Sequence, residues 1–454
     1  MERENKLGIE PINKLILTMA LPAVAAQLVN VFYNIVDRMY IGHIADIGPF
    51  ALTGLGLCLP ITMGISAFSA FVGAGGAPLA AIELGRKNKE QAERILGNGV
   101  TMIVTLSIIL SVVIIIAKKP LLYAFGASDI TYTYANEYLS IYGLGTIFVM
   151  ISLGLNNFII CQGQSKTAMI SVLIGAALNI ILDPIFIFLL DMGVTGAAIA
   201  TVISQFVSSV WIVRFLISKK SEIKIKKQNL KVNPKVLAAI MALGISPFIM
   251  QITESIVNIT FNVGLQKYGG DLYVGAMTIM QSVMQLVVIP VMGLTQGTQP
   301  IISYNYGANN FDRVKEAFKK ILIITVLITT AATLCTWVFP QIFARIFTTN
   351  GELIDLVSKL LPIFMAGIFI FGVQMACQSA FMGMGQAKIS LFLALLRKVF
   401  LLIPLAIILP MFVGVKGIII AEPISDIIAA VTTGTIFLLY IKKLFRNQNK
   451  SEIN

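Results

Sequence analysis

The chain has 454 residues, of which 57% are hydrophobic and only 12% charged, and its mean hydropathy is +0.87. This composition excludes a soluble globular protein of ordinary kind and predicts a membrane protein that crosses the bilayer many times. The net charge of +12 comes from lysines and arginines that gather between the apolar runs, where they govern orientation, so no nucleic-acid partner is expected.

The apolar runs, taken in chain order, predict an all-α integral membrane protein with twelve transmembrane helices. Each run is long enough to cross a hydrocarbon core of about 30 Å at about 1.5 Å per residue. The N-terminus leads into the first run without a small-residue cleavage site, so that run is expected to be a transmembrane helix. The predicted helices cover about 14–41, 50–80, 94–117, 134–158, 166–190, 194–217, 236–265, 273–303, 318–343, 353–382, 388–412 and 417–440.

A strongly basic linker separates the sixth and seventh predicted helices. Because lysine and arginine favour the cytoplasmic side of a membrane, the linker is expected there, and counting spans from it places both termini there as well. We therefore expect a multi-pass protein of the cell (inner) membrane. Its predicted parts are a first six-helix lobe at 1–217, a cytoplasmic linker at 218–235, a second lobe at 236–446 and a cytoplasmic tail at 447–454.

The sequence also repeats itself at a spacing of about 222 residues, which is typical of two homologous halves. Since each half holds six helices, both enter the membrane with the same orientation, related by an axis along its normal. This symmetry predicts a cleft between two lobes. The matching stretches are 84–88 with 306–310, 163–166 with 385–388, and 193–196 with 414–417.

Two polar residues lie one helical turn apart within an apolar run of the first half. Asn179 and Asp183 share a helix face at this spacing, and Pro184 cannot donate a backbone hydrogen bond, so a kink is expected at the carboxylate. An ionisable group inside a membrane span indicates a functional site. The alternative is that Asp183 marks a helix end in the headgroup layer.

Two further polar residues are predicted at the same depth in the membrane. Asp37 and Thr201 lie, like Asp183, roughly 7–12 Å below the outer surface when the spans are counted at about 1.5 Å per residue. Two carboxylates, an amide and a hydroxyl form a set of hard oxygen ligands suited to Na⁺ or a shared proton. Asp37, Asn179, Asp183 and Thr201 are therefore the predicted coupling site, and no other metal site is expected.

The second half offers further candidates. Glu254 lies deep in the seventh predicted helix without an evident partner, so either substrate binding or a structural role is open. Arg397 and Asp426 lie at depths that favour a structural ion pair over a substrate contact. Three methionines, which could line an adaptable substrate pocket or pack in the interior, are Met277, Met280 and Met284.

These residues resemble the multidrug and toxic compound extrusion (MATE) transporters, in the DinF-like/MepA-like branch, over nearly the whole membrane portion. The resemblance implies the MATE fold of the MOP superfamily and gives Asp37, Asn179, Asp183 and Thr201 the role of a cation or proton site. Related NorM-like members carry an acidic residue in the seventh helix, which Glu254 matches, and another in the tenth. Residues 371–382 contain no Asp or Glu, which favours coupling in the first lobe. The matching stretches are 22, 36–42, 84–94, 162–164, 179–184 and 193–201.

The resemblance implies a secondary antiporter, and not an enzyme, that exports organic, often cationic, drugs in exchange for Na⁺ or H⁺. No cofactor beyond the coupling ion is expected; the partners would be drug molecules and the bilayer, and the protein would act as a monomer. One alternative is a flippase for lipid-linked oligosaccharides, which would need a larger basic cavity. An intramembrane enzyme is the other, although the single histidine, His43, lies in a loop and no catalytic motif accompanies it.

Overall fold

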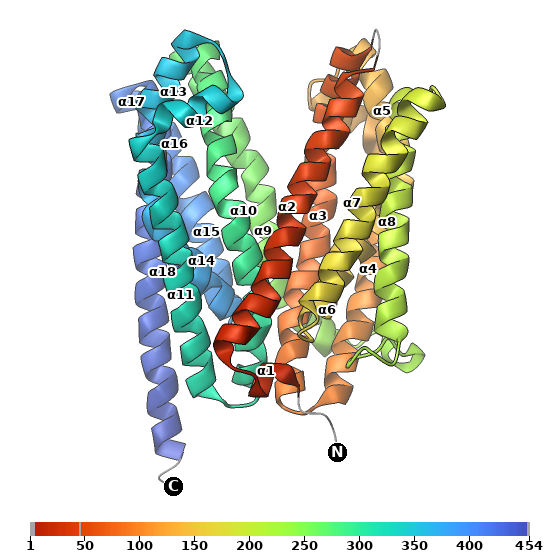
Figure 1. Ribbon diagram of the computed structural model, residues 1–454, viewed down its shortest axis with the longest axis vertical. Helices are drawn as coiled ribbons and strands as arrows, with labels where there is room; N and C mark the ends of the chain where they lie inside the picture. Colours follow the sequence, from red (N-terminus) through yellow and green to blue (C-terminus); the bar gives the residue numbers. More distant parts are fainter. Residues whose placement is uncertain (1–4, 45–46, 452–454) are drawn as a thin grey trace.

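The protein is an all-helical molecule whose two lobes meet at one end and diverge toward the other (Figure 1). The structure is a computed structural model, and it describes residues 5–44 and 47–451. Both termini lie at the end where the lobes meet, which we name the terminal face; the opposite end is the open face (Figure 1). The molecule thus has the shape of a V.

The first lobe contains the helices up to α8. A short helix, α1, precedes the first long one. The bounds are α1 (Lys6–Ile9), α2 (Ile12–Gly42), α3 (Gly48–Gly85), α4 (Lys89–Ala124), α5 (Asp129–Leu144), α6 (Thr146–Ile160), α7 (Ser165–Pro184), the π-helix η1 (Ile185–Leu189) and α8 (Gly193–Ile217).

The second lobe begins at α9, after a linker that contains a single 3₁₀ turn, η2 (Lys227–Leu230). The last helix, α18, continues through the predicted tail as far as Ser451. The bounds are α9 (Pro234–Gly269), α10 (Asp271–Gly307), α11 (Phe311–Val338), α12 (Pro340–Phe347), α13 (Gly351–Phe364), the 3₁₀ turn η3 (Met365–Gly367), α14 (Ile368–Gly383), α15 (Ala387–Leu395), the π-helix η4 (Leu396–Leu402), α16 (Ile403–Ile408), α17 (Pro410–Val413) and α18 (Val415–Ser451).

The predicted fold class is confirmed, with one span differing in shape. Among the described residues, eleven helical segments are long and apolar enough to cross a membrane, and the pair α5–α6 provides a twelfth. We predicted that span as one helix, 134–158, whereas the structure divides it into α5 and α6, with a bend of 58° at Gly145. The bend lies where Gly145 packs directly against Val202 of α8, an approach that leaves no room for a larger side chain.

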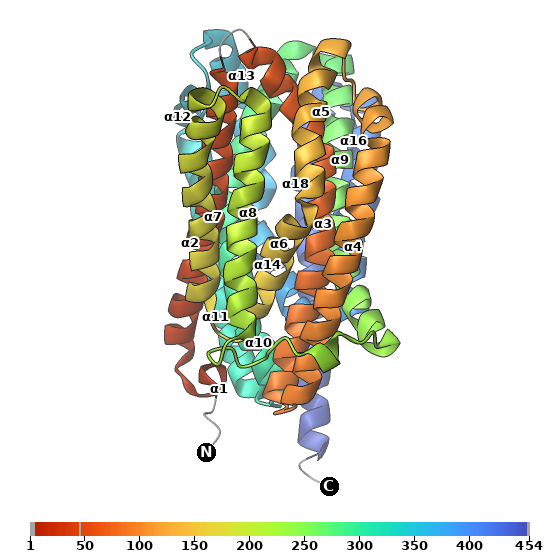
Figure 2. The ribbon, with the colours of Figure 1, turned by 90° about the vertical axis from the view of Figure 1, so that its right-hand side faces the viewer.

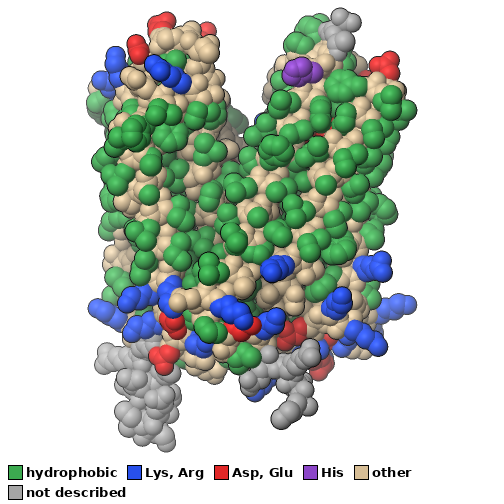
Figure 3. Space-filling view, viewed as in Figure 1, with side chains coloured by type: hydrophobic (Ala, Val, Ile, Leu, Met, Phe, Trp, Pro, Cys, Tyr) green, Lys and Arg blue, Asp and Glu red, His purple; other side chains and the backbone are tan. Residues whose placement is uncertain are grey.

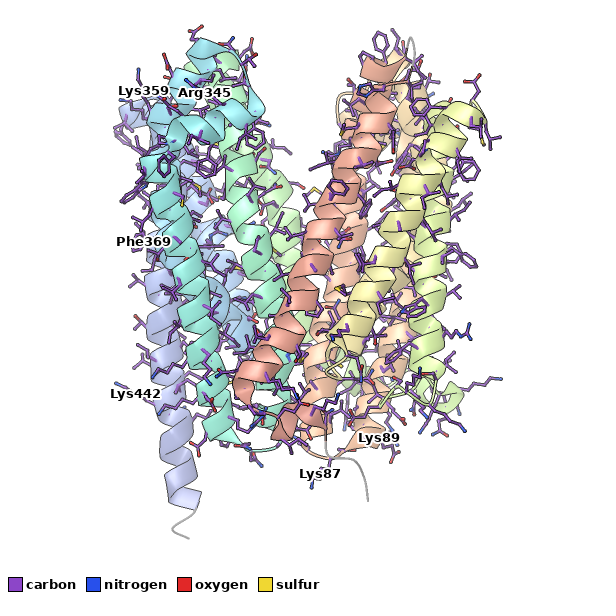
Figure 4. The ribbon with its side chains drawn as sticks, viewed as in Figure 1. Lys87, Lys89, Arg345, Lys359, Phe369 and Lys442 are labelled. Carbon is purple, nitrogen blue, oxygen red and sulfur yellow. The ribbon has the colours of Figure 1, made fainter. Side chains whose placement is uncertain are left out.

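The outer surface is that of a membrane protein. Hydrophobic side chains cover the middle of the face seen in Figure 3, and lysines and arginines form a band near the terminal face. Lys87 and Lys89 lie at that end, and Arg345 and Lys359 at the open face (Figure 4). The chain is therefore a multi-pass membrane protein with its apolar belt between two polar ends.

The lobes touch near the terminal face through a pair of glycines at corresponding positions of the two halves. Gly85 of α3 packs against the backbone of Tyr304 in α10, and Gly307 of α10 packs against the backbone of Ile82 in α3. A methyl group on either glycine would collide with the opposing carbonyl oxygen. Small residues allow helix backbones to approach this closely within a membrane.

We expect Gly85→Val to open the terminal face. The clash with Tyr304 should cost about 1–3 kcal/mol in the arrangement seen here, which shifts the population toward one in which these helices separate. Cys161 lies in the small space between α3, α6 and α10 and should react about tenfold faster with a maleimide as a result. The labelled peptide would be identified by mass spectrometry in a Cys335→Ser background. Gly56→Val, in the same helix but facing open space, is the control; an equal acceleration there would contradict the prediction.

Helix α1 fastens the two lobes together at the terminal face. Leu7 is fully buried, and its carbonyl oxygen accepts hydrogen bonds from Asn305 Nδ2 at 2.9 Å and Arg313 Nη2 at 3.1 Å, both in the second lobe. The side chain of Asn5 donates to Glu222 Oε2 in the linker at 2.5 Å. Since the linker packs on the first lobe, α1 bridges the two.

The linker lies along the terminal face of the first lobe (Figure 2). Gln162, at the end of α6, accepts hydrogen bonds at Oε1 from the backbone N–H groups of Glu222 at 2.7 Å and Ile223 at 3.2 Å. Asn98 Oδ1 of α4 accepts another from the Asn233 N–H at 2.7 Å. The linker is thus a strap fixed to the first lobe as far as Asn233, where α9 begins.

We expect Gln162→Ala to release this strap. The substitution removes the side-chain oxygen that accepts from two backbone N–H groups of the linker, which lowers the free energy of unfolding by about 1–3 kcal/mol. The linker then opens locally more often, and its lysines become accessible to trypsin. Cleavage in folded protein should become about tenfold faster. Gln164→Ala, two residues away and exposed, should leave the rate unchanged. Equal rates for the two variants would show that Gln162 does not fix the linker.

Candidate functional site

The polar pair of the first lobe lies where α7 changes its helical register. The α-helix ends at Pro184, and the next five residues form the π-helix η1. Pro184 has no N–H to offer the carbonyl of Ile180, which loosens the backbone beside Asp183. The predicted kink is therefore a change from α to π geometry, a feature often found at functional sites.

Asn179 links the polar residues of the site. Its Nδ2 donates to Asp183 Oδ1 at 3.0 Å and approaches Thr201 Oγ1 of α8 at 3.4 Å. Asp183 is 0% exposed, Asn179 2% and Thr201 9%. The structure thus brings together three of the four residues predicted for the coupling site, in the interior of the lobe.

Asp37 completes the group from α2. It is 8% exposed, and its carboxyl group lies within hydrogen-bonding contact of that of Asp183. Two carboxyl groups in such contact and in low dielectric repel each other strongly when both are ionised. A positive charge between them, either a proton or a small cation, removes that repulsion.

Three oxygen atoms of this group have no hydrogen-bond donor among the described residues. They are Asp37 Oδ1, Asn179 Oδ1 and Asp183 Oδ2. Buried polar atoms in native proteins are almost always satisfied, so a proton or a hard cation would be stabilised at this group of acceptor oxygens. Carboxylate and amide oxygens are ligands suited to a hard cation such as Na⁺, and the same oxygens can accept a proton.

A cleft of about 920 Å³ lies between the lobes and reaches the coupling residues. Asn179 and Thr201 are on its wall, so the buried carboxyl pair is separated from the cleft by one layer of side chains. Arg38 is the one charged side chain among the described residues that line it. The wall is otherwise rich in amides and hydroxyls, among them Asn30, Asn34, Asn156, Asn258, Ser282 and Gln285.

Amide side chains connect the lobes across this cleft. Gln296 of α10 accepts from Gln27 of α2 at 2.8 Å and donates to Asn157 of α6 at 3.0 Å. All three line the cleft. The sequence analysis missed this connection, although the signal that singled out Asn179, an amide within an apolar span, is present at each of the three.

The MatE family model matches two stretches of the chain, 22–185 and 247–408, one in each lobe. The chain belongs to the MatE family. The first stretch contains Asp37, Asn179 and Asp183, whereas Thr201 in α8 lies outside both stretches. Family membership thus agrees with the predicted resemblance.

Relatives of this MatE protein cover nearly its whole length. It is 24% identical over 434 residues to the multidrug export protein MepA of Staphylococcus aureus strain N315, covering 96% of this chain and 95% of that protein. With MepA of Staphylococcus haemolyticus the identity is 25% over 419 residues, 92% of each chain.

Solved structures of MATE transporters share the fold. A multidrug resistance transporter of the MOP superfamily in an outward-facing conformation superposes with a TM-score of 0.90, at 24% identity, over 98% of this chain and 99% of that one. A MATE structure in a bent conformation gives a TM-score of 0.89 at 26% identity, over 96% and 97% of the two chains.

The second lobe of the MatE protein holds a buried network of charges. Arg397 donates to Asp426 Oδ1 at 2.6 Å and to Glu422 Oε1 at 3.1 Å, and its guanidinium lies 4.6 Å from the ring centre of Phe371. The ion pair between Arg397 and Asp426, predicted from depth alone, is present. It holds η4 against α18.

Glu254 has a partner that the sequence analysis did not assign. It forms an ion pair with Lys398, the residue after Arg397, while remaining half-exposed. Lys398 is itself buried and lies close to the carbonyl oxygen of Met250. Glu254 is not among the described residues that line the cleft, and its role in substrate binding or in structure stays a prediction.

The three predicted pocket methionines lie in the second lobe's interior. Met277 and Met280 are buried within its hydrophobic core, and Met284 packs against that core. None of the three lines the described cleft, so packing accounts for them. Met277 and Met280 belong to the buried cluster that also contains Leu361 of α13 and Phe371 of α14, a placement that the sequence alone could not give.

Proposed function

We propose that this MatE protein is a secondary active multidrug efflux antiporter coupled to Na⁺ or H⁺. The observation that carries the proposal is the trio of buried oxygens without donors on Asp37, Asn179 and Asp183, next to the wall of a large inter-lobe cleft. The relatives named as multidrug export proteins support drugs as the exported substrate. The protein would act as a transporter and not as an enzyme, with the ion as co-substrate.

The terminal face would lie in the cytoplasm of the cell, with both termini on that side. Lysines and arginines gather at this face (Figure 3), and the sequence places them in the linker, in the turn before α4 and in the first turns of α11, as expected for the cytoplasmic side. The cleft would then open to the outside, as in the outward-facing transporter structure that shares this fold.

The charge of the coupling site explains how the ion and the drug can be exchanged. With one shared ion, Asp37 and Asp183 together carry one negative charge; when the ion has left they carry two, and the pair attracts a cationic drug more strongly across the layer formed by Asn179 and Thr201. Drug and ion therefore weaken each other's binding, and this reciprocity is what exchange requires. Amides and hydroxyls of the wall would hold neutral parts of varied drugs.

The test is transport by purified protein in liposomes. A fluorescent organic cation, such as ethidium, would be followed under an imposed Na⁺ gradient and then under an imposed pH gradient. Drug movement against its own gradient in either case supports the antiporter and identifies the ion. If neither gradient moves any of several organic cations, the proposal fails, and movement of a labelled lipid-linked sugar would instead support the flippase alternative.

A further inference from the structure

A second cavity, of about 370 Å³, lies between the lobes close to the terminal face. Its size falls within the range of small-molecule sites, which often occur between domains. Ile82 and Ile95 of the first lobe and Val236 of the second give it apolar walls. Arg86 at the end of α3 and Lys235 at the start of α9 are at its rim, and both are exposed.

The internal symmetry of the fold relates this cavity to the site occupied by α1. Helix α1 contacts Tyr304, Asn305, Arg313 and Gly163. The positions about 222 residues away in the other half are Ile82, Glu83, Gln91 and Gly385, and all four line the cavity. The cavity is therefore the symmetry-related counterpart of the site in which α1 packs.

The site occupied by α1 shows which chemical groups suit such a cavity. There the apolar side chain of Leu7 is buried, while Asn305 and Arg313 donate hydrogen bonds to the carbonyl oxygens of Leu7 and Glu10. The cavity has the same two elements, apolar walls and donors. Its donors, Arg86 and Lys235, lie at the rim, where Glu83 offsets one of their two positive charges.

The charges at the rim favour an anion. Arg86 forms an exposed ion pair with Glu83 at 2.7 Å, which leaves the positive charge of Lys235 in excess among the charged residues lining the cavity. An exposed pair of this kind contributes little and rearranges readily. A ligand with a phosphate group could thus engage Arg86 and Lys235 together, with its apolar part against Ile95 and Val236.

We infer that this cavity binds the phosphate headgroup and first methylene groups of an anionic phospholipid of the cytoplasmic leaflet. The inference rests on the orientation proposed above, which places the cavity at the level of that leaflet's headgroups. Basic pockets between transmembrane helices on the cytoplasmic side suit such lipids. Because both lobes form its walls, a bound lipid stabilises the arrangement in which the terminal face is closed.

The test is native mass spectrometry of the delipidated full-length protein titrated with phosphatidylglycerol. The double variant Arg86→Gln/Lys235→Gln should bind this lipid roughly tenfold or more weakly, because each basic group near an anionic lipid contributes to binding. Gln91→Trp, which fills the cavity and keeps both charges, should weaken it as well. Lys227→Gln/Lys231→Gln removes two exposed charges from the linker outside the cavity and should bind like wild type.

Any of four outcomes would overturn the inference. Equal loss in the linker variant would mean that surface charge alone attracts the lipid. Unchanged binding in Gln91→Trp would place the lipid elsewhere. Equal binding of phosphatidylcholine, or displacement of the lipid by soluble glycerol phosphate at similar concentration, would show that an anionic lipid is not the ligand. Thermal unfolding of each variant checks that it is folded, and these results do not depend on whether drugs are transported.

Discussion

Replacing Asp183 by asparagine is expected to abolish ion-driven drug export while leaving the fold intact. The substitution keeps the size of the side chain and an oxygen that can accept from Asn179 Nδ2, now 3.0 Å from Asp183 Oδ1. It removes the charge that the coupling ion would neutralise, so the ion loses its preference between the two lobe arrangements. In liposomes with an imposed gradient, transport should fall by at least about a hundredfold.

Asp191→Asn is the matched control for this experiment. Asp191 is an exposed carboxylate just beyond η1, and its backbone has a φ of 51°, a conformation that asparagine tolerates well. It should transport like wild type, and Asp37→Asn should fail like Asp183→Asn. Full transport by Asp183→Asn at equal protein content would remove the coupling role from this carboxylate.

Replacing Arg397 by methionine should give the largest loss of stability. Glu422 and Asp426 would then be buried without their shared cation, and breaking a buried ion pair in this way typically costs about 3–5 kcal/mol. The triple variant Arg397→Met/Glu422→Gln/Asp426→Asn should recover part of the loss, since no charge is left without a partner. Unfolding of the protein in mixed micelles titrated with SDS would measure both changes.

Lys320→Met is the control, because it removes an ion pair at the surface. Lys320 pairs with Glu316 one helical turn away, and both side chains are partly exposed. Removing such a pair should change the unfolding free energy by less than about 1 kcal/mol. If Arg397→Met proved as mild as Lys320→Met, the network would not be the structural element that its burial indicates.

The candidate site was predictable because hydrophobic surroundings make polar residues conspicuous. Asp37, Asn179, Asp183 and Thr201 interrupt apolar runs, and counting residues from helix ends placed three of them at one depth and Asn179 one turn deeper. The structure brings them together. What depth could not give is rotation about each helix axis, which is why Met277 and Met280 were considered for a pocket and lie in the second lobe's core.

The features that sequence periodicity did not predict depend on contacts between helices. The bend at Gly145 follows from the approach of Val202, and the partner of Glu254 follows from the π-helix that carries Lys398. A π-helix advances each residue by a smaller angle than an α-helix does, so faces assigned with a period of 3.6 residues are wrong beyond it. The path of the linker likewise depends on Gln162 and Asn98, which belong to other helices.

The two lobes meet in a reciprocal contact that has the geometry of a homodimer interface: Gly85 packs on Tyr304, and Gly307 packs on Ile82. In such an interface one patch binds its own copy about a two-fold axis, and here both copies belong to a single polypeptide. The covalent connection at residues 218–233 is therefore not part of this contact between the lobes. Two halves synthesised as separate polypeptides should still recognise each other, and a first half synthesised alone would present a patch able to pair with a second copy of itself.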